Sequence, residues 1–406
     1  MPGFQLSPAH RLWRLLPPQH RRQLISTVTT WLAPRPGLPP ATTAAPGLVV
    51  VGELSRASGL GEAARVSLAA LKPLGIPAYG VDIGSLLPGG GGDAPVMDMP
   101  PGVPLLLHVN PPLLAYTLLR LPRRLLRDRL VIAQWAWELP AVPADWRRAT
   151  RFVHRLWAPS RFTGEALDAL LPGRVQNVPH PLAMSPPRPS NLSRADFGLS
   201  SNALLVLVSF NLASSLVRKN PLGAIAAFRA AFGDRPDRQL LLKIGNPDQW
   251  PEDFASIQAA VAGAANIRIE TRTLPTADTH ALTACADIVL SLHRSEGFGL
   301  VPAEAMLLGR PVIATGWSGN MDFMDADSAA LIGYRLIPAR DPRGVYDIPG
   351  TMWAEPDHGE ATAALQRLGE DAELRARIGA RGRAMAKARL GVGPMQAALA
   401  ELGIRA

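Results

Sequence analysis

Two glutamates, Glu296 and Glu304, are the residues of this 406-residue chain whose spacing points most clearly to chemistry. Seven residues separate them, among them Gly297 and Gly299, and an apolar run at 287–292, typical of a buried strand, precedes them. Glu296 is therefore expected in the loop at the carboxyl end of a strand, where open α/β sheets bind their ligands. There its carboxylate could accept hydrogen bonds from sugar hydroxyls.

A short helix is expected after these glycines. Pro302 suits its first position, Gly309 suits its C-terminal cap, and Pro311 ends it. This places Glu304 in the first helical turn, beside backbone N–H groups that favour anions such as a diphosphate. A purely structural interpretation is also open, in which Glu304 only stabilises the helix dipole and Glu296 is a solvated loop residue.

A basic pair, Arg218 and Lys219, stands between a second apolar strand at 203–210 and a helix expected from about Pro221. A cation beside a helix N-terminus, at the carboxyl end of a strand, would stabilise a diphosphate leaving group as its charge develops. The alternative is a pair of solvated charges that merely precede the helix.

These groups need a frame of parallel strands to bring them together, and the sequence alternates strand and helix from Gly47 onwards. In the first half we expect strands at 47–52, 78–83, 104–108 and 130–135 and helices at about 62–71, 112–119, 146–154 and 161–170. In the second half we expect strands at 203–210, 239–245, 266–270, 287–292 and 311–315, a helix at about 221–232 and a helical tail from about 360. Apolar strands alternating with helices indicate parallel sheets that are covered on both faces.

The expected fold class is α/β, with two Rossmann-like domains that face each other across a cleft. A linker at 183–200, rich in proline and polar residues, marks the boundary between them. The other expected parts are a basic, proline-rich N-terminal segment at 1–46, an N-terminal domain at 47–182, a C-terminal domain at 201–388, and a last helix at 389–406 that could pack back on the N-terminal domain.

The Glu296–x7–Glu304 pair, inside the run SEGFGL at 295–300, resembles the signature of retaining GT-B glycosyltransferases of family four. The resemblance implies a C-terminal domain that holds a nucleotide-sugar donor. It implies that Glu296 approaches the transferred sugar and that Glu304 accepts hydrogen bonds from the nucleotide ribose. It also implies donor contacts from the backbone of Phe298, Gly299 and Leu300.

The segment RKNP at 218–221 is similar to the basic pair that neutralises the donor diphosphate in this family. The resemblance implies a catalytic role for Lys219. Many members carry an arginine about six residues before this lysine, where the present chain has Ala213. Arg218 is therefore only the candidate for the second positive charge.

Five further motifs resemble a bacterial subgroup of these enzymes that is commonly encoded with polysaccharide synthesis. They are SGLGEAAR at 58–65, QWAWELP at 134–140, WAPSRF at 157–162, WSGNMDF at 317–323 and WAEPD at 353–357. The resemblance covers roughly residues 47–390.

The histidine that this family carries in its N-terminal domain is absent from the corresponding strand end, which reads WAWE at 135–138. Glu138 is the preferred polar contact of this domain with the acceptor. His108 and His180 are the nearest histidines expected at the cleft. A lone histidine is more often structural, so each has a structural alternative.

Gly59 and Gly61 are expected in a glycine-containing loop that closes over donor phosphates or the acceptor. With Ala64 they also match a dinucleotide fingerprint, and Asp82 stands where a ribose-binding acid would lie. An NAD-dependent oxidoreductase is therefore an alternative. It is disfavoured because six residues, 53–58, separate the preceding strand from the glycines.

The resemblance implies a retaining hexosyltransferase that moves a sugar, with mannose as the first candidate, from a nucleotide-diphosphate sugar to a glycan or lipid-linked glycan. No cofactor is expected. No metal site is expected either, because Asp322 and Asp325 lack a third ligand. A catalytically silent GT-B scaffold is the non-enzyme alternative, which the glutamate pair and Lys219 oppose.

The composition agrees with a cytoplasmic two-domain protein. A hydrophobic fraction of 47% and a charged fraction of 18% exclude wholesale disorder. The single cysteine, Cys285, excludes an internal disulfide. No apolar run reaches the roughly 20 residues of a membrane-spanning helix, and no signal peptide is recognised.

The net charge of +9 comes almost entirely from arginine. Nucleic acid is not an expected partner, because the chain has no zinc finger, RNP-type motif or long basic run. Leucines and arginines interleave at 11–34, which suggests an anchor on the inner face of an anionic membrane or, equally, a helix packed on the body. The arginines expected to join in membrane contact are Arg120, Arg123, Arg124, Arg127 and Arg129.

Overall fold

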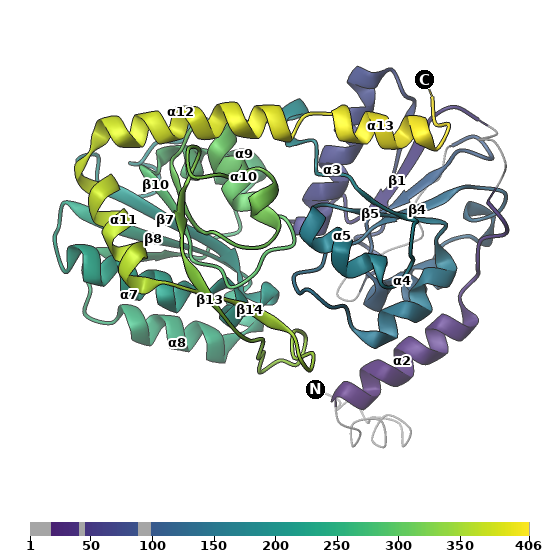
Figure 1. The fold of residues 1–406 in the computed structure, drawn as a ribbon, viewed down its shortest axis with the longest axis horizontal. Helices are drawn as coiled ribbons and strands as arrows, with labels where there is room; N and C mark the ends of the chain where they lie inside the picture. The colour runs from purple at the N-terminus through teal and green to yellow at the C-terminus, as the bar shows by residue number, and fades with distance from the viewer. Residues whose placement is uncertain (1–17, 40–44, 88–98, 406) are drawn as a thin grey trace, which may run out of the picture.

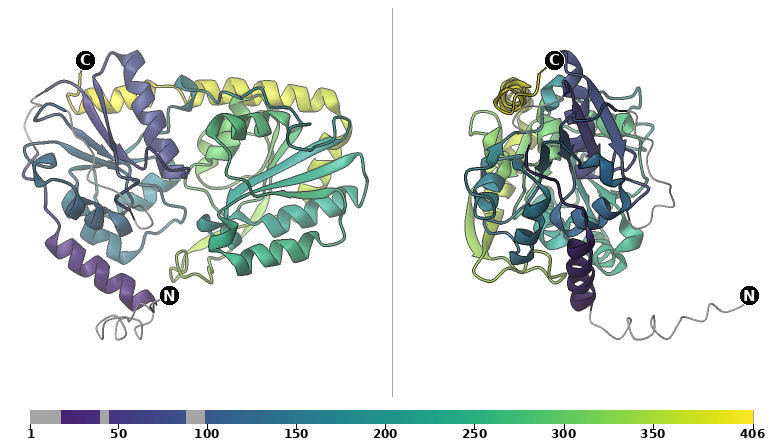
Figure 2. Two further views of the ribbon diagram at one scale, coloured as in Figure 1. Left: turned by 180° about the vertical axis from the view of Figure 1, so that it is seen from behind. Right: turned by 90° about the vertical axis from the view of Figure 1, so that its right-hand side faces the viewer.

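The computed structural model describes residues 18–39, 45–87 and 99–405, which form two lobes side by side, each built on a parallel sheet with helices against it (Figure 1). Part of the basic N-terminal segment, residues 1–17, lies outside the described ranges. Views from behind and from the side show the last helices running along one edge of both lobes (Figure 2).

The N-terminal lobe has a six-stranded parallel sheet in the order β2-β1-β3-β4-β5-β6. The strands are β1 (Leu48–Gly52), β2 (Ala78–Asp82), β3 (Leu105–Leu107), β4 (Val131–Gln134), β5 (Arg155–Ala158) and β6 (Val175–Asn177). Helices α3 (Gly59–Leu71), α4 (Pro111–Arg120) and α5 (Arg161–Asp168) connect them. All residues of β1, β3 and β4 are buried, as expected for strands covered on both faces.

The segment expected to be an α-helix at 146–154 is instead a 3-10 helix, Ala144–Phe152. Its buried residues, Trp146, Ala149 and Phe152, recur at intervals of three. This spacing aligns side chains on one face of a 3-10 helix, whereas an α-helix would spread them apart.

Strands β5 and β6 were not expected from the sequence. They are short, and Arg155, Gln176 and Asn177 interrupt their apolar pattern. They extend the sheet beyond β4, and α5 connects them.

The C-terminal lobe has a second six-stranded parallel sheet in the order β12-β11-β10-β7-β8-β9. The strands are β7 (Leu204–Asn211), β8 (Arg238–Gly245), β9 (Ile267–Glu270), β10 (Ile288–Ser291), β11 (Val312–Thr315) and β12 (Ala330–Ile332). The helices are α6 (Leu216–Lys219), α7 (Pro221–Phe232), α8 (Pro251–Val261), α9 (Thr276–Cys285), α10 (Leu300–Leu307) and α11 (His358–Glu370). The five strands expected in this half are present, and β12 adds an unexpected edge strand.

An antiparallel hairpin, β13 (Tyr334–Pro338) and β14 (Met352–Pro356), follows β12 and was also not expected. Its side chains Ala339, Tyr346 and Trp353 belong to the apolar core of the N-terminal lobe, although the hairpin comes from the C-terminal half of the chain. The hairpin therefore joins the two lobes (Figure 1).

The last two helices, α12 (Ala372–Arg389) and α13 (Gly393–Glu401), bridge the lobes along one edge (Figure 2). Met395 and Leu399 of α13 belong to the same buried apolar cluster as Leu48 and Val50 of β1, so α13 contributes to the core of the N-terminal lobe. At the other end of the described chain, helix α2 (Pro18–Leu32) lies beside α4 (Figure 1). No helix of the described residues is long and apolar enough to cross a bilayer.

Candidate active site

Helix α10 starts earlier than the sequence indicated. Gly299, with φ of 98°, precedes Leu300 as the N-cap, so Pro302 is the third helical residue and Glu304 the fifth. Glu304 therefore lies in the second turn, and its expected place in the first turn is wrong. Gly299 adopts this left-handed conformation at no steric cost, which lets the helix begin two residues before the proline. Among the described residues, the backbone N–H groups from Gly297 to Val301 donate to no acceptor, and those of Leu300 and Val301 are the first two of α10.

Glu296 is buried and is held by two cations from the segment after β7. Lys219 Nζ lies 2.5 Å from its Oε1, and Arg218 Nη1 lies 3.3 Å from its Oε2. Its backbone N–H donates to Ser318 Oγ at 2.8 Å. Burial raises the pKa of Glu296, but Lys219 and Arg218 outweigh burial and lower this pKa to about 2. Glu296 is therefore ionised at neutral pH.

Arg218 is almost fully buried, and its guanidinium faces the protein. It donates to the carbonyl of Ser295 at 2.7 Å and lies 3.7 Å from Glu138 Oε1 in the other lobe. Its Cζ lies 5.3 Å from the ring centroid of Tyr346. The side chain of Lys219 is 20% exposed, which leaves Lys219 as the cation of the pair that can reach a ligand. Burial lowers the pKa of Lys219.

Asn220 positions this basic pair. It is left-handed, with φ of 51°, ends α6 and caps α7 through a bond from Gly223 N–H to its Oδ1. Its side-chain amide also donates to the carbonyl of Leu292, at the end of β10. One asparagine thus joins the Lys219 segment to the loop that carries Glu296.

Glu304 faces Glu62 of α3 in the N-terminal lobe. Burial, and then the charge of Glu62, raise the pKa of Glu304 to about 8, although Arg65 lowers it in part. Arg65 is engaged with Glu62 at 2.6 Å. Glu304 is therefore mostly protonated at neutral pH.

Helix α3 includes both glycines that were expected in a loop. Ser58 caps it by accepting the N–H of Gly61, and Gly59 is its first residue. Gly61 is required by packing, because a Cβ there would lie 2.5 Å from the carbonyl oxygen of Glu53. At Gly59 the nearest atom to an added Cβ would be Leu300 Cδ1, at 3.7 Å. The N-termini of α3 and α10 thus face each other across the two lobes.

His108 and His180 are both buried, and each has a ring nitrogen without a partner in the described residues: Nε2 of His108 and Nδ1 of His180. Burial lowers the pKa of His108 to about 3, with a further contribution from His180, and burial lowers that of His180 to about 4. Both imidazoles are therefore neutral at physiological pH. The ring of His180 packs edge-on against Phe298, with centroids 4.7 Å apart. Phe298 is itself a core residue, so its side chain is not available to a donor.

Glu138 lies at the junction of the lobes. Its carbonyl accepts the hydroxyl of Ser295, and its Oε2 accepts the hydroxyl of Tyr346 at 3.1 Å. The ring of Tyr346 stacks on Trp137, with centroids 5.4 Å apart. The side chain of Glu138 is thus occupied by groups of the C-terminal lobe.

Three residues beside the Glu296 loop were not predicted as site residues: Ser160, Thr163 and Tyr346. Ser160 lies in the motif at 157–162 and caps α5, and Thr163 is the third residue of that helix. Tyr346 lies in the connection of an unexpected hairpin. The part of the sequence near Tyr346 held no indication that it meets Glu138, 208 residues away.

The dinucleotide alternative finds little support in the geometry. Asp82 Oδ1 accepts the backbone N–H groups of Ser55 and Gly84, so this carboxylate holds the loop after β1.

Asp322 is paired with Arg161 at 2.9 Å, and Asp325 caps the turn before Ser328. Among the residues that the structure describes, no three histidine, cysteine or acidic side chains group as metal ligands.

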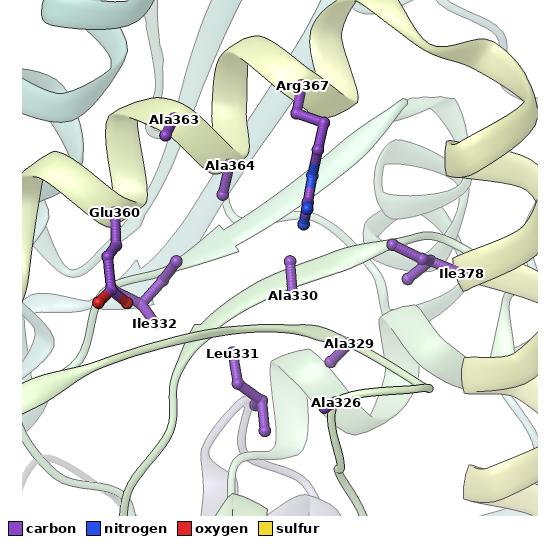
Figure 3. Close-up of a pocket in the computed structure, with 10 residues that line it drawn as sticks. All are labelled: Ala326, Ala329, Ala330, Leu331, Ile332, Glu360, Ala363, Ala364, Arg367 and Ile378. Atoms are coloured by element: carbon purple, nitrogen blue, oxygen red, sulfur yellow. The ribbon is translucent and has the colours of Figure 1, made fainter.

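A pocket of about 380 Å³ lies in the C-terminal lobe between β12, α11 and α12 (Figure 3). Alanines line much of it, with Glu360 and Arg367 of α11 at its side. The Glu360 carboxylate accepts the N–H of Gly333, so it holds the local backbone. The pocket contains none of the residues around Glu296.

Residues 211–348 match the family described as Glycosyl transferases group 1. The matched region contains the basic pair, Glu296 and Glu304. The chain therefore carries a glycosyltransferase domain, as the sequence predicted.

The chain is also similar to a D-inositol 3-phosphate glycosyltransferase of Nocardioides sp. (strain ATCC BAA-499 / JS614), with 27% identity over 221 residues. The match covers 52% of this chain and 44% of the relative, so the chain spans less than half the length of the curated relative it matches.

Two solved structures share the architecture. Anabaena HepE in complex with UDP and glucose has a TM-score of 0.59 at 15% identity, with 88% of this chain and 99% of that chain covered. Sucrose-phosphate synthase from Thermosynechococcus elongatus has a TM-score of 0.60 at 16% identity, with 88% and 98% covered. These likenesses confirm the expected GT-B fold, with two parallel-sheet α/β domains.

Proposed function

We propose that this protein is a retaining, metal-independent glycosyltransferase of family four that transfers a sugar from a nucleotide-diphosphate donor. The observation that carries the proposal is the Lys219–Glu296 pair at 2.5 Å, placed beside the free N–H groups of α10. A buried ionised carboxylate, a partly exposed lysine side chain and a helix N-terminus can together stabilise the charges that develop as a sugar–diphosphate bond breaks.

The donor diphosphate lies at the N-terminus of α10, where the N–H groups from Gly297 to Val301 and the helix dipole favour an anion. Lys219 stabilises the charge that develops on the leaving diphosphate. Backbone groups of Phe298, Gly299 and Leu300 contact the donor, and Glu304 accepts hydrogen bonds from the ribose. Gly59 is the first residue of α3 and has no side chain that would cover the N-terminus of this helix. A phosphate can therefore approach the N-terminus of α3 as well.

Glu296 stabilises the positive charge that develops on the transferred sugar. The acceptor hydroxyl attacks from the face that the diphosphate leaves, and the leaving phosphate takes the hydroxyl proton. No separate general base is then needed, which agrees with neutral His108 and His180 of lowered pKa. The acceptor enters from the N-terminal lobe, and a dry, closed cleft protects the donor from water.

The proposed acceptor is a glycan or lipid-linked glycan, as in polysaccharide synthesis. The transferred sugar is a hexose, with mannose from GDP-mannose as the first candidate and glucose from UDP-glucose as the second. The second is favoured by the likeness to a protein whose structure holds UDP and glucose.

The protein also works at an anionic membrane, on its cytoplasmic face, in this proposal. Leu24, Val28, Trp31 and Leu32 of α2 are exposed apolar side chains at helical spacing. Trp31 is 76% exposed, and Leu38 beyond the helix is 93% exposed.

Exposed arginines accompany these apolar side chains. Arg120 ends α4, which lies beside α2, and Arg123, Arg124 and Arg127 follow it on the surface. Arg129, which was expected in this group, is instead buried and donates to the carbonyls of Val103 and Pro100. Apolar side chains flanked by exposed arginines suit an anionic lipid surface.

A silent scaffold is the alternative, and one experiment separates the two. Purified protein is incubated with GDP-mannose, UDP-glucose and related donors, and released nucleoside diphosphate is measured beside thermal shifts with GDP, UDP and ADP. The proposal expects stabilisation by one nucleoside diphosphate and slow donor turnover that an acceptor accelerates. Binding of every diphosphate at a common weak affinity, without turnover of any donor, would favour the scaffold.

A further inference from the structure

The loop that carries Glu296 is bonded to the N-terminal lobe on both sides of this residue. On one side, the hydroxyl of Ser295 donates to the carbonyl of Glu138. On the other side, the carbonyl of Gly297 accepts the hydroxyl of Ser160 at 2.6 Å. Thr163 Oγ1 lies 3.1 Å from the same carbonyl and 2.8 Å from that of Trp137.

The backbones also meet closely here. A Cβ on Gly297 would lie 2.8 Å from the carbonyl oxygen of Trp137, so only glycine allows this contact between the lobes. Behind the loop, a Cβ on Gly319 would lie 2.3 Å from the Gly297 carbonyl oxygen. The loop is therefore fitted between the N-terminal lobe and its own domain.

A second connection reaches the carboxylate of Glu296 itself. Buried Arg218 lies between Glu296, at 3.3 Å, and Glu138 of the other lobe, at 3.7 Å. Tyr346 donates to Glu138 and lies under the guanidinium. Arg218 now lies between two carboxylates, those of Glu138 and Glu296. If Glu138 moved away, only Glu296 would attract the guanidinium, and the position of Arg218 relative to Glu296 would change.

We propose that Thr163, Ser160 and Glu138 are positioning residues through which the N-terminal lobe sets the place of Glu296. The first two act on the backbone after Glu296, and Glu138 acts on its carboxylate through Arg218. This inference rests on the proposed function and describes how that function is regulated. The carboxylate of Glu296 takes its reacting position only when the two lobes are docked.

Such coupling has a chemical consequence. When the lobes separate, the Gly297 carbonyl and the Ser295 hydroxyl lose their partners, and the loop is free to relax. A donor bound to the C-terminal lobe alone would then face a displaced Glu296 and resist hydrolysis. A displacement of about 1 Å at a reacting group can cost about 100-fold in rate.

Two substitutions that preserve shape test the proposal: Thr163→Val and Glu138→Gln. Ser160 is left unchanged because its hydroxyl oxygen also caps α5 by accepting the N–H of Thr163 at 3.1 Å. The matched controls are Thr117→Val, a buried threonine that bonds the carbonyl of Leu113 within α4, and Glu165→Gln, an exposed glutamate of α5. The measurements are kcat, donor KM, nucleoside diphosphate affinity by calorimetry, melting temperature, and hydrogen exchange of the peptide 293–300.

The proposal expects kcat to fall at least about tenfold in both test variants. Nucleoside diphosphate affinity should fall by less than kcat, because Lys219 is unchanged and only the N–H groups of the loosened loop are affected. Exchange of peptide 293–300 should rise in both test variants and in neither control. A parent-like kcat in both test variants, or unchanged exchange of this peptide, would overturn the proposal.

The exchange measurement separates this inference from the proposed function. If the parent protein turns over no donor, the glycosyltransferase proposal fails, yet the exchange of peptide 293–300 still decides whether Thr163 and Glu138 hold the loop. If the parent is active and both variants melt far below the controls, Ser295→Ala takes their place, because it removes only the bond to the Glu138 carbonyl.

Discussion

Lys219 Nζ lies 2.5 Å from Glu296 Oε1, and these residues are 77 positions apart in the chain. The pair joins the segment after β7 to the loop after β10, which are neighbouring strands of one sheet. Because both strands end at the same edge, the fold brings the two charges together in front of the α10 N-terminus. This contact links the proposed leaving-group cation to the proposed sugar-facing carboxylate.

Replacement of this cation should impair both binding and chemistry. In Lys219→Met, we expect kcat to fall by about 100-fold or more, because one well-placed electrostatic contact is worth roughly 3–4 kcal/mol. Nucleoside diphosphate affinity should fall as well, since the ammonium would no longer meet the diphosphate. Steady-state kinetics and calorimetry measure both effects. Lys387→Met, at an exposed position of α12, is the control and should behave like the parent.

The pKa of Glu304 predicts a proton release when a nucleotide binds. Glu304 is mostly protonated in the free protein, because burial and Glu62 raise its pKa to about 8. Hydrogen bonds from ribose hydroxyls favour the carboxylate and lower this pKa, so binding should release a proton at pH 7 and strengthen as pH rises towards 8. Calorimetry in two buffers of different ionisation enthalpy counts the proton.

Glu62→Gln provides the matched control for this prediction. Loss of the facing charge should lower the pKa of Glu304, and less proton should then be released at pH 7. Proton uptake on binding, or equal release from the parent and from Glu304→Gln, would show that Glu304 does not meet the ribose.

Much of the frame could be predicted from the sequence, because buried parallel strands are apolar along their length. The strands at 203–210 and 239–245 and the helix from Pro221 agree with β7, β8 and α7 to within about a residue. The missed strands β5 and β6 are short and partly polar, so their pattern carried little signal.

The site could be predicted only where its residues are close in sequence. Glu296 and its glycines stand in one loop, and that loop lies at the expected strand end. Glu304 lies in the second turn because the left-handed conformation of Gly299 lets α10 begin at Leu300. The sequence had indicated a later start, since proline is common at the first helical position and the chain has Pro302. Contacts between the lobes, such as Tyr346 with Glu138, depend on how the domains dock, and no local pattern encodes that.

Chelation tests the proposed independence from metals. After dialysis against EDTA, we expect transfer activity to remain largely intact, because Lys219 and the α10 N-terminus stabilise the leaving diphosphate without a cation. Activity is measured before and after dialysis, and again with added magnesium or manganese. Activity that disappears with EDTA and returns with manganese would contradict the proposal.

Membrane association is tested with vesicles. We expect the full chain to co-sediment with vesicles of anionic lipid at low salt and to be released as salt rises, because the arginine contribution is screened. Trp31→Ser should weaken binding by removing an exposed apolar side chain. Leu336→Ser, at an exposed site of β13, is the control. Equal binding to neutral vesicles, or a protein that stays in the supernatant at low salt, would count against the anionic surface.

The central claim is that Glu296 meets the transferred sugar, and Glu296→Gln tests it most directly. The substitution keeps the shape of the side chain but removes the charge, so turnover should fall by about 100-fold to 1,000-fold. Nucleoside diphosphate affinity should change little, since it depends on Lys219, Glu304 and the α10 N-terminus, whereas Glu304→Gln should weaken it by about 1.5–3 kcal/mol. The decisive measurement is the turnover number of Glu296→Gln beside its nucleoside diphosphate dissociation constant. A folded variant with parent-like turnover would contradict the account.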